Sequence, residues 1–587
     1  MAGHNDLDKE MKPGAVEDAM YDYDVVVIGG GPAGSTVATL LSQWGRRVLL
    51  LEKEHFPRHH IGESLLPLAS RVMQRLGVLD KVERANFVHK LGATYVWGKT
   101  RQPWTISFSE MIDDTIHAYQ VERARFDTLL LEHSRECGAR VQEGCRVTEM
   151  LHEDGRATGV RYLDEAGVLH TVSSQFCVDA SGQGAVIGRS MRFRRFNRPL
   201  RNIALYAYFR GGKPLIEFVH DLSPQSQGNI FVVAVDIGWI WYIPLGDELF
   251  SVGLVTDASL AKGMNQEGRR KFYLDTLAAT PEISFLLADA RLESDSLYTQ
   301  SDWSYICRSF QGPGYLLVGD ASCFVDPILS TGVTLAMDGG LQAALTINTA
   351  LSDPQRTTWA MNWYEEQYRG KFQSFLQMAV HWYKGHRNQD TWFWRAKQLI
   401  DSSSNLSIRQ AFILLTAGFA AGLPSQEPLE LQEMGGFSPS QVKTIYDHLD
   451  NAVLEQAREK LVQQLTPATL ALKKLAEGNG ENVAMSQPRF AAGMRYTISM
   501  DERDNLLQPF VQIVHEEAGI AKKQINMPIT SLPLFERIDG KRQVRVIAAE
   551  VAALLGGEQE DGMRDLEQTF VTAIIQELYR QHVIEPV

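Results

Sequence analysis

Runs of apolar residues alternate with helix-forming stretches in the N-terminal part of the chain. Asp24–Ile28 (DVVVI) and Arg47–Leu51 (RVLLL) are short apolar runs, typical of parallel strands that are covered on both faces. A helix is predicted between them, over Ser35–Trp44. Gln175–Gly182 and Gly314–Asp320 are predicted as two further strands, each with an aspartate near its end. This succession predicts an α/β fold.

A different pattern fills residues 200–310. Apolar and polar residues alternate there in three runs, Ile203–Phe209, Asn229–Val235 and Phe250–Thr256. Such alternation predicts an antiparallel sheet that covers a ligand of the first domain. From Leu341 the pattern becomes helical. The aromatic residues crowded into Trp363–Trp394 are interpreted as helix packing rather than as a partner surface.

Composition restricts the class of protein. The chain has 587 residues, enough for two to four structural units. Its 58 Lys and Arg against 71 Asp and Glu give a net charge of −13, which argues against a nucleic-acid partner. The five cysteines form no CxxC pair, which argues against structural zinc and a disulfide scaffold and favours a reducing, cytoplasmic compartment.

Two segments bear on targeting. The first 20 residues are polar and acidic, so a flexible leader rather than a signal peptide is expected over 1–20. Residues 25–45 carry no charge, but their glycines and small residues favour a buried strand followed by a buried helix over a membrane span. No membrane association is expected.

The first chemical signal lies between the first predicted strand and helix. Gly29, Gly31 and Gly34 fit the GxGxxG pattern. In that pattern the first glycine permits a tight turn, the second lets the backbone approach a pyrophosphate, and the third lets helix and strand pack closely. Glu52 ends the next strand, where a carboxylate accepts hydrogen bonds from a ribose. Strand, glycines, helix and Glu52 together predict a dinucleotide site.

Later segments favour flavin over nicotinamide. Gly319 and Asp320 end the strand at 314–320, where a carboxylate can bind the ribityl chain of a flavin. Because they lie far from the glycines in sequence, the nucleotide-binding domain must be discontinuous. Arg123 and Arg125 open a predicted helix and could reach phosphates, although such arginines are more often surface residues.

With these parts, the chain resembles the FAD-dependent monooxygenase superfamily of the hydroxybenzoate-hydroxylase fold. Trp239–Pro244 (WIWYIP) fits WxWxIP, the signature of flavin-dependent halogenases. Trp239 and Trp241 project from the same face of a strand and are expected to wall a passage beside the flavin. The alternative, two core aromatics, is the weaker interpretation in this context. Phe56–Pro57–Arg58 and Ile61–Pro67, with its Gly-Glu-Ser, also resemble segments of the superfamily.

Two further segments resemble halogenases of the chloramphenicol-pathway type, which act on phenols, pyrroles or acyl groups. Val88–Gly98 resembles the segment that bears the essential lysine, and Lys90 falls on that position. Ser330-Thr331-Gly332 resembles the halide-binding segment at the start of a helix, where Thr331 and Gly332 would offer free N–H groups. Tryptophan halogenases carry a glutamate just before this serine; here it is Leu329, which argues against free tryptophan as the substrate.

The resemblance implies an FADH2-dependent halogenase of natural-product biosynthesis. It implies that a flavin C4a-hydroperoxide and chloride or bromide give hypohalous acid, which Lys90 guides to an electron-rich aromatic or enolisable acyl substrate, free or tethered to a carrier protein. Burial would lower the pKa of this lysine. A separate NAD(P)H-dependent reductase would supply reduced flavin. Asp302 lies in a DWSY segment that is attached covalently to the flavin in a relative, so a covalent bond is a further hypothesis.

The residues expected at the site therefore fall into three groups. The catalytic group is Lys90, Trp239 and Trp241, and the halide ligands are Thr331 and Gly332. The expected FAD-binding residues are Gly29, Gly31, Ala33, Gly34, Glu52, Lys53, Arg58, Glu63, Ser64, Arg123, Asp302, Gly319, Asp320, Pro327, Gly332 and Val333. No metal site is expected, because His59, His60 and His89 lack metal-binding spacing and are interpreted as ordinary polar residues.

The sequence also predicts how the chain divides into domains. A discontinuous FAD-binding domain is expected over 21–350, with 90–115 and 200–305 forming the substrate-covering sheet, followed by a helical region over 351–472, a linker over 473–500 and a small helical or winged-helix-like module over 501–587. A flavin hydroxylase, a reductase of the same fold and an inactive flavin-bearing scaffold remain as alternatives. Halide-dependent product formation separates them.

Overall fold

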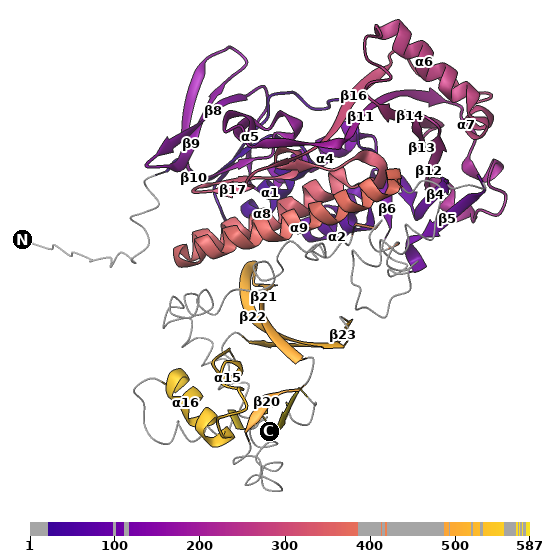
Figure 1. The fold of residues 1–587 in the computed structure, drawn as a ribbon. Coiled ribbons are helices and arrows are strands. Elements are labelled where there is room, and N and C mark those ends of the chain that lie inside the picture. Colours follow the sequence, from indigo (N-terminus) through magenta and orange to yellow (C-terminus); the bar gives the residue numbers. More distant parts are fainter. Residues whose placement is uncertain are drawn as a thin grey trace, which may run out of the picture. The chain divides into compact units, whose positions relative to one another are not determined.

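The computed structural model describes residues 21–97, 101–110, 117–384, 413, 417–418, 487–491, 494–517, 520–528, 532–556, 571–572, 574–575, 578 and 583–586. The predicted leader at 1–20 and most of the predicted helical region beyond residue 384 lie outside these residues. The chain divides into two compact units (Figure 1), one made of Met1–Ile400 and Leu406–Ser425, the other of Asp401–Asn405 and Gln426–Val587. Each is described by itself.

The first unit contains the predicted parallel sheet. Its strands follow the order β17-β18-β10-β1-β2-β7. Their bounds are Gln311–Gly312, Tyr315–Leu317, Leu169–Asp179, Tyr23–Ile28, Val48–Leu51 and Arg140–Gln142. Strand β1 pairs in parallel with β10 and β2, and β10 is extended by an antiparallel hairpin of β8 (Arg146–Glu153) and β9 (Arg156–Leu163). The continuous apolar runs are buried as predicted.

Helices cover this sheet. Helix α1 (Pro32–Gln43) follows β1 and packs against α4 (Arg123–Glu136) and α8 (Gly332–Ser352). The long helix α9 (Thr357–Lys384) lies alongside α8 (Figure 1). Its aromatic residues up to position 384 are largely buried in the core, in agreement with the packing interpretation. Because α9 packs on α8, the predicted boundary at 350/351 falls inside the first unit.

The second sheet of this unit has nine strands and is mainly antiparallel. Its order is β19-β16-β11-β14-β13-β12-β4-β5, with β15 paired to β11. The bounds are Cys323–Phe324, Tyr298–Cys307, Arg194–Arg210, Leu249–Asp257, Gly238–Gly246, Ile230–Val235, Gly92–Val96, Pro103–Ser107 and Arg291–Leu292. Only β12 and β4 are parallel neighbours within it.

The two faces of this sheet contact different surroundings, as the alternating pattern predicts. Trp239 and Trp241 of β13 belong to the large core shared with the parallel sheet. Ile240 and Tyr242 face a smaller core that includes α6 (Gln266–Ala279) and α7 (Pro281–Leu286). The sheet therefore presents its tryptophan face toward the parallel sheet and its helices.

Short elements connect the two sheets. They are α2 (Pro67–Leu76), α3 (Leu79–Arg84), β3 (Val88–Lys90), β6 (Ala118–Gln120) and α5 (Val186–Ser190). Strands β3 and β6 form a separate antiparallel pair, and single-turn helices at Gly319–Ala321 and Pro327–Leu329 precede α8.

The second unit differs from the predicted linker and helical module. Strands β21 (Met494–Arg503), β22 (Leu506–Glu517) and β23 (Ile520–Pro528) form an antiparallel sheet. Strand β20 (Pro488–Phe490), inside the predicted linker, pairs with β24 (Ile584–Pro586). Helix α16 (Val544–Gly556) lies within the predicted helical module over 501–587, and α15 (Leu532–Phe535) comes before it in the chain. Glycines and polar residues suggested a linker, but ladder pairing with β22 makes 494–503 a strand.

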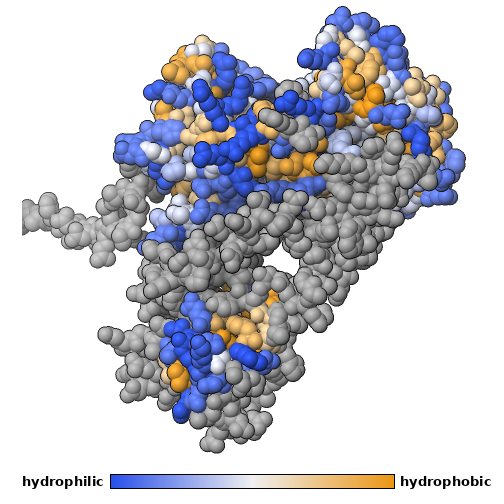
Figure 2. Space-filling model, in the orientation of Figure 1, coloured by the Kyte–Doolittle hydropathy of each residue, from blue (hydrophilic) through white to orange (hydrophobic). Residues whose placement is uncertain are grey.

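Few large apolar side chains are exposed. Among the described residues they are Val168, Leu169, Phe196, Leu260, Phe285 and Val546. The face seen in Figure 2 mixes hydrophilic areas with smaller apolar ones. No helix in the described ranges combines the length and the apolar character needed to cross a bilayer.

Candidate active site

The glycine turn after β1 forms one end of a cavity. Gly29 has φ +101°, and a Cβ there would lie 2.5 Å from the Ala180 carbonyl oxygen. A Cβ on Gly34 would lie 1.9 Å from the Gly29 carbonyl oxygen, so helix and strand approach too closely for any other residue. Gly31 is the N-cap of α1. Glu52 stabilises the turn, because its Oε2 accepts a hydrogen bond from Gly30 N at 2.7 Å.

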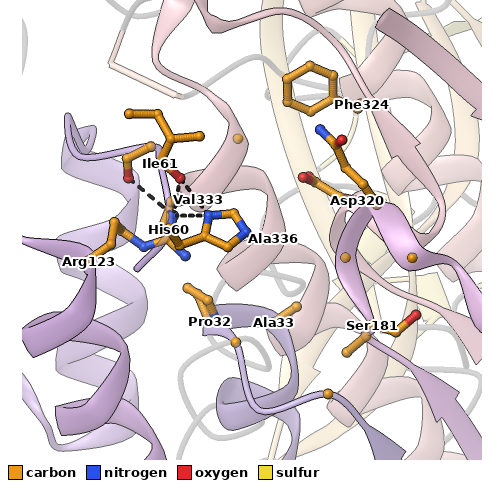
Figure 3. A pocket seen from close by; sticks show the side chains of 18 of the residues that line it. Pro32, Ala33, His60, Ile61, Arg123, Ser181, Asp320, Phe324, Val333 and Ala336 are labelled. Carbon is orange, nitrogen blue, oxygen red and sulfur yellow. Dashed lines mark hydrogen bonds between the residues drawn. The ribbon is translucent and has the colours of Figure 1, made fainter. Parts of the chain in front are cut away.

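The cavity itself has a volume of about 470 Å³ and lies between the parallel sheet and the tryptophan face of the second sheet. It brings together most of the predicted site residues, namely Gly29, Gly31, Ala33, Glu52, Lys53, Arg58, Glu63, Ser64, Arg123, Trp239, Trp241, Asp320, Pro327, Gly332 and Val333. Figure 3 shows part of its wall, with Pro32 and Ala33 near the glycine turn and Asp320 and Phe324 opposite His60, Ile61 and Arg123.

Arg58 supplies positive charge beside the glycine turn. Its Nη2 lies 3.5 Å from Asp127 Oδ2 and would lie 3.4 Å from a Cβ on Gly31. Its Nη1 is buried without a hydrogen-bond partner among the described residues. An unpartnered buried guanidinium nitrogen is costly unless a ligand satisfies it. Together with the N-terminus of α1, it suits a diphosphate group. Lys53, in contrast, is largely exposed at the rim.

Arg123 is held by the protein itself. Its Nε and Nη2 donate to the two carboxylate oxygens of Asp127, both at 2.8 Å. Its Nη1 donates to the Ile61 carbonyl at 2.6 Å and lies 3.3 Å from His60 Nδ1 (Figure 3). Through these contacts Arg123 holds the 60–62 loop in place. Exposed Arg125 pairs with Glu122 outside the cavity.

Asp320 lies across the cavity from Arg123 (Figure 3). Burial raises the pKa of this carboxyl to about 7, although the charges of Arg123 and Arg194 oppose the shift. Gly319 precedes it with φ +61°, and a Cβ there would lie 3.2 Å from Ala33 Cβ. Because Gly319 and Ala33 are small, the strand end that carries Asp320 lies close to the start of α1.

The predicted halide segment forms the start of α8. Ser330 adopts a left-handed conformation (φ +57°), and buried Thr331 is the N-cap residue without a side-chain capping bond. The first N–H groups of an α-helix have no acceptor within the helix, and they carry partial positive charge. Gly332 and Val333 line the cavity, so the start of α8 lies at the cavity wall. The arrangement suits an anion.

Lys90 is the last residue of β3 and is 1% exposed. Its Nζ donates to Ser64 Oγ at 2.8 Å and to the Leu65 carbonyl at 2.9 Å, and lies 5.8 Å from the centre of the Phe108 ring. Burial lowers the pKa of this amine to about 7. Lys90 thus lies behind Ser64, which lines the cavity, and points away from bulk solvent.

Trp239 and Trp241 are both buried and line the cavity. Trp239 Nε1 donates to the Tyr383 hydroxyl at 2.8 Å, and Trp241 Nε1 donates to Ser251 Oγ at 3.1 Å. Gly253 lies directly opposite Trp241 on β14, and a Cβ there would lie 2.2 Å from the indole. This glycine therefore lets the indole lie across the sheet.

A hydrogen-bonded network that the sequence did not indicate connects the tryptophan strand to the helix start. Asp326 Oδ1 accepts from Tyr383 Oη at 2.9 Å and from Ile328 N at 3.0 Å. Its Oδ2 accepts from Asn202 Nδ2 at 3.0 Å. Since Tyr383 also accepts from Trp239, this network links α9, β11, β13 and the 326–331 loop.

The histidines divide between two places. His59 and His60 line the cavity rather than acting as unrelated polar residues. His89 lies on the surface, where it and His117 contact the Glu83 carboxylate at 3.2 and 3.1 Å. The side chain of Asp302 is outside the described part of the chain, although its backbone lies in β16 opposite Asn202. The covalent-flavin hypothesis stays a prediction.

A mixed α/β fold with a glycine-turn cavity and a WxWxIP strand defines a flavin-dependent oxidoreductase. The sequence model of the tryptophan halogenase family matches residues 24–116 and 110–419. The chain is 30% identical over 486 residues to tryptophan 2-halogenase of Chondromyces crocatus, covering 81% of this chain and 89% of that protein. The chain therefore belongs to the tryptophan halogenase family of flavin-dependent halogenases, enzymes that use FAD and halide.

Two solved structures share the fold. The myxobacterial chondrochloren halogenase CndH is 38% identical with a TM-score of 0.59, covering 73% of this chain and 96% of that one. The flavin-dependent halogenase CmlS is 26% identical with a TM-score of 0.63, covering 97% of this chain and 96% of that one. The predicted FAD-binding fold with its second sheet is confirmed.

Proposed function

We propose that this protein uses FADH2, dioxygen and halide to halogenate an electron-rich aromatic or enolisable acyl substrate in natural-product biosynthesis. The observation that carries the proposal is Lys90, a desolvated amine that donates to Ser64, a residue on the wall of the cavity that the glycine turn and the start of α8 also line. The proposal includes a separate NAD(P)H-dependent reductase and a cytoplasmic location, which agrees with five unpaired cysteines.

The residues around the glycine turn fit FAD. Gly29–Gly34 and unpartnered Arg58 Nη1 suit its diphosphate, Glu52 its ribose and Asp320 its ribityl chain. Ala33, Pro327 and Val333 supply apolar contacts at the cavity wall. When bound as FADH2, this cofactor supplies with dioxygen the oxidising equivalent that converts halide into hypohalous acid. Arg123 keeps the 60–62 loop in place around it.

The protein residues then hold halide and guide the oxidant. Thr331 and Gly332 would bind halide through the N–H groups and positive end of α8. Trp239 and Trp241 occupy the wall and exclude water, which limits loss of hypohalous acid. Lys90 would hold the oxidant by a hydrogen bond or as a chloramine, since its lowered pKa makes the neutral amine accessible near pH 7.

The substrate class rests on a different residue. Leu329 is buried at the position where tryptophan halogenases carry a glutamate. This apolar side chain offers nothing to a free amino acid, so we propose a phenol, pyrrole or acyl substrate, free or tethered to a carrier protein. A tryptophan substrate would contradict this part of the proposal.

Lys90→Met tests the proposed role because it keeps the volume of the side chain and removes the amine. We expect the variant to bind FAD and consume dioxygen when supplied with FADH2, but to lose at least about 100-fold in halogenated product, as for loss of a proton-transfer group. Mass spectrometry of candidate substrates, using the chlorine isotope pattern, measures the product.

The matched control is Lys271→Met, which removes an exposed lysine of α6. It should retain normal product formation. Normal halogenation by Lys90→Met would remove this lysine from the mechanism, and hydroxylated products that do not depend on halide would favour the hydroxylase alternative.

A further inference from the structure

Glu63 is a buried carboxyl group that the proposed scheme does not yet use. It is 3% exposed and lines the cavity, next in sequence to Ser64, the partner of Lys90. Its Oε1 accepts a hydrogen bond from Tyr208 Oη at 2.8 Å. Its Oε2 is buried and makes no well-formed hydrogen bond within the described ranges, although the Ser251 hydroxyl lies close enough to the carboxyl group to stabilise its charged form. A carboxyl oxygen left in this state costs free energy unless a ligand completes it.

The Tyr208 hydroxyl lies between the Glu63 carboxyl group and the solvent-exposed side chain of His59. Its hydroxyl oxygen lies 3.0 Å from Nε2 of His59, whose side chain is exposed at the cavity mouth. The imidazole is held in place by Tyr298, because the two rings stack with centroids 4.3 Å apart. His59, Tyr208 and Glu63 therefore form a continuous chain of proton-exchanging groups from the surface to the cavity wall.

We propose that Glu63 is a proton-transfer residue of the halogenation site and that Tyr208 and His59 connect it to bulk water. The inference rests on the proposed halogenase function and adds a role that differs from simple cofactor contact. Protonated Glu63 gives its proton to the oxygen of hypohalous acid while the halogen bonds to the substrate carbon, so that the halogen–oxygen bond breaks and water leaves.

The second half of the step restores the carboxyl group. The substrate carbon now carries both hydrogen and halogen, and its carbon–hydrogen bond breaks. The electron pair returns to the aromatic or enol system, and the proton passes to the Glu63 carboxylate. The sum is R–H + X–OH giving R–X + H2O, with Glu63 unchanged. The Tyr208–His59 chain lets Glu63 equilibrate with solvent when substrate fills the cavity.

The charge environment suits both directions of transfer. Burial raises the pKa of Glu63 to about 7, and Glu122 acts in the same direction. The hydroxyl groups of Ser251 and Tyr208 and the Arg123 guanidinium oppose the shift. An acid–base group works best when its pKa lies near the operating pH, because both protonation states are then available.

Glu63→Gln tests the role because it keeps the shape and removes the exchangeable acid. In FAD-loaded protein we expect halogenated product to fall about 10²- to 10⁴-fold, while dioxygen consumption continues and hypohalous acid reaches an external thiol probe. Tyr208→Phe should give a smaller loss. The matched control is Tyr273→Phe, whose hydroxyl donates to the Val252 carbonyl and touches none of these groups. Its product formation should stay unchanged.

Infrared difference spectroscopy provides a readout that does not depend on turnover. A protonated-carboxyl band titrating near pH 7 should be present in the wild type and absent in Glu63→Gln, while the band of Asp320 remains. In Tyr208→Phe the Glu63 band should shift in frequency, because its hydrogen-bond donor is gone. If Glu63→Gln fails to fold, this shift decides the matter.

The outcomes separate the inference from the function on which it rests. Wild-type product levels from Glu63→Gln, or levels restored merely by saturating FAD, would overturn the proton-transfer role. An unchanged carboxyl band in Tyr208→Phe would do the same. Failure of the wild type to halogenate any substrate would instead refute the proposed function, and the infrared titration would still report on Glu63.

Discussion

Lys90 brings a titratable amine into a part of the protein that excludes water. An ammonium group has three hydrogens to donate, and within the described ranges two acceptors receive them, Ser64 Oγ and the Leu65 carbonyl oxygen. Ser64 in turn lines the cavity, so this amine lies directly behind the cavity wall. Because desolvation penalises the charged form, the folded protein binds this proton less tightly than the unfolded chain does.

This difference in pKa predicts a dependence of stability on pH. The pKa is about 7 in the folded state, against 10.5 for an exposed lysine. Between these values the unfolded state binds more protons than the folded state, so the free energy of unfolding rises with pH. Below about pH 7 both states carry the proton, and the destabilisation caused by burying the charged amine is then at its full extent. Relative to Lys90→Met, wild-type stability should rise with a limiting slope of about 1.4 kcal/mol per pH unit.

Urea unfolding of both proteins from pH 6 to pH 10 measures this slope. Other buried groups such as Glu63 and Asp320 titrate in both proteins, so the difference isolates Lys90. Exposed Lys271→Met serves as the control and should run parallel to the wild type. Parallel curves for Lys90→Met as well would mean that the amine is solvated in the folded state.

The 326–331 loop, which leads into the segment predicted to bind halide, is joined to α9 by a hydrogen bond. Tyr383 of α9 donates to Asp326 and accepts from Trp239, so one hydroxyl group joins the 326–331 loop to the tryptophan strand. Asn202 of β11 contacts both Asp326 and Tyr383 at 3.0 Å. We therefore expect a change at Tyr383 of α9 to reach the start of α8.

Tyr383→Phe should loosen this connection. It leaves the buried Trp239 indole N–H without its acceptor, at a cost of about 1–3 kcal/mol. It also removes one of the two hydrogen bonds to Asp326 Oδ1, which keeps the one from Ile328 N. We expect lower thermal stability and a several-fold higher KM for chloride, measured by product formation at varied halide. Tyr364→Phe is the matched control on the same helix, because its hydroxyl donates to the Leu317 carbonyl at 2.7 Å. An equal rise in chloride KM in both variants would contradict the specific role of Tyr383.

Locally encoded elements were predictable from the sequence, and contacts between distant segments were not. The glycine turn needs only a strand, three glycines and a helix in succession, so 29–34 could be identified directly. The hydrogen bond between Trp239 and Tyr383 spans 144 positions, and nothing in either local sequence indicates it. Arg123 shows a related limit, since its charge suggested a phosphate ligand but the fold gives it Asp127.

The strands of the second unit were missed for a different reason. The sequence from Met494 to Arg503 mixes polar and apolar residues beside a glycine-containing stretch, and that composition resembles a linker. Its ladder with Leu506–Glu517 is what makes it a strand. Helix α16 agrees with the helical module expected over 501–587, because the amphipathic period of a helix lies within its own sequence.

At the scale of the whole molecule, each compact unit has a hydrophobic core of its own. In the first unit, a large core includes both the parallel sheet and the tryptophan face of the second sheet. In the second unit, a separate core is built from residues between Val511 and Ile584. The cavity with all its described lining residues belongs to the first unit.

Separate cores predict that a defect in one unit leaves the other intact. Ile347 of α8 and Ile547 of α16 are both fully buried, one in each core, and replacing either by alanine should cost about 2–5 kcal/mol in its own unit. Hydrogen-exchange mass spectrometry of the full chain measures this peptide by peptide. Ile547→Ala should lose protection in α16 and β22 while α8, β1 and FAD content stay as in the wild type, and Ile347→Ala should show the reverse. Because chemistry is assigned to the first unit alone, halogenated product per bound FAD should be unchanged in Ile547→Ala; loss of protection in β1 in that variant would mean that the two cores unfold as one.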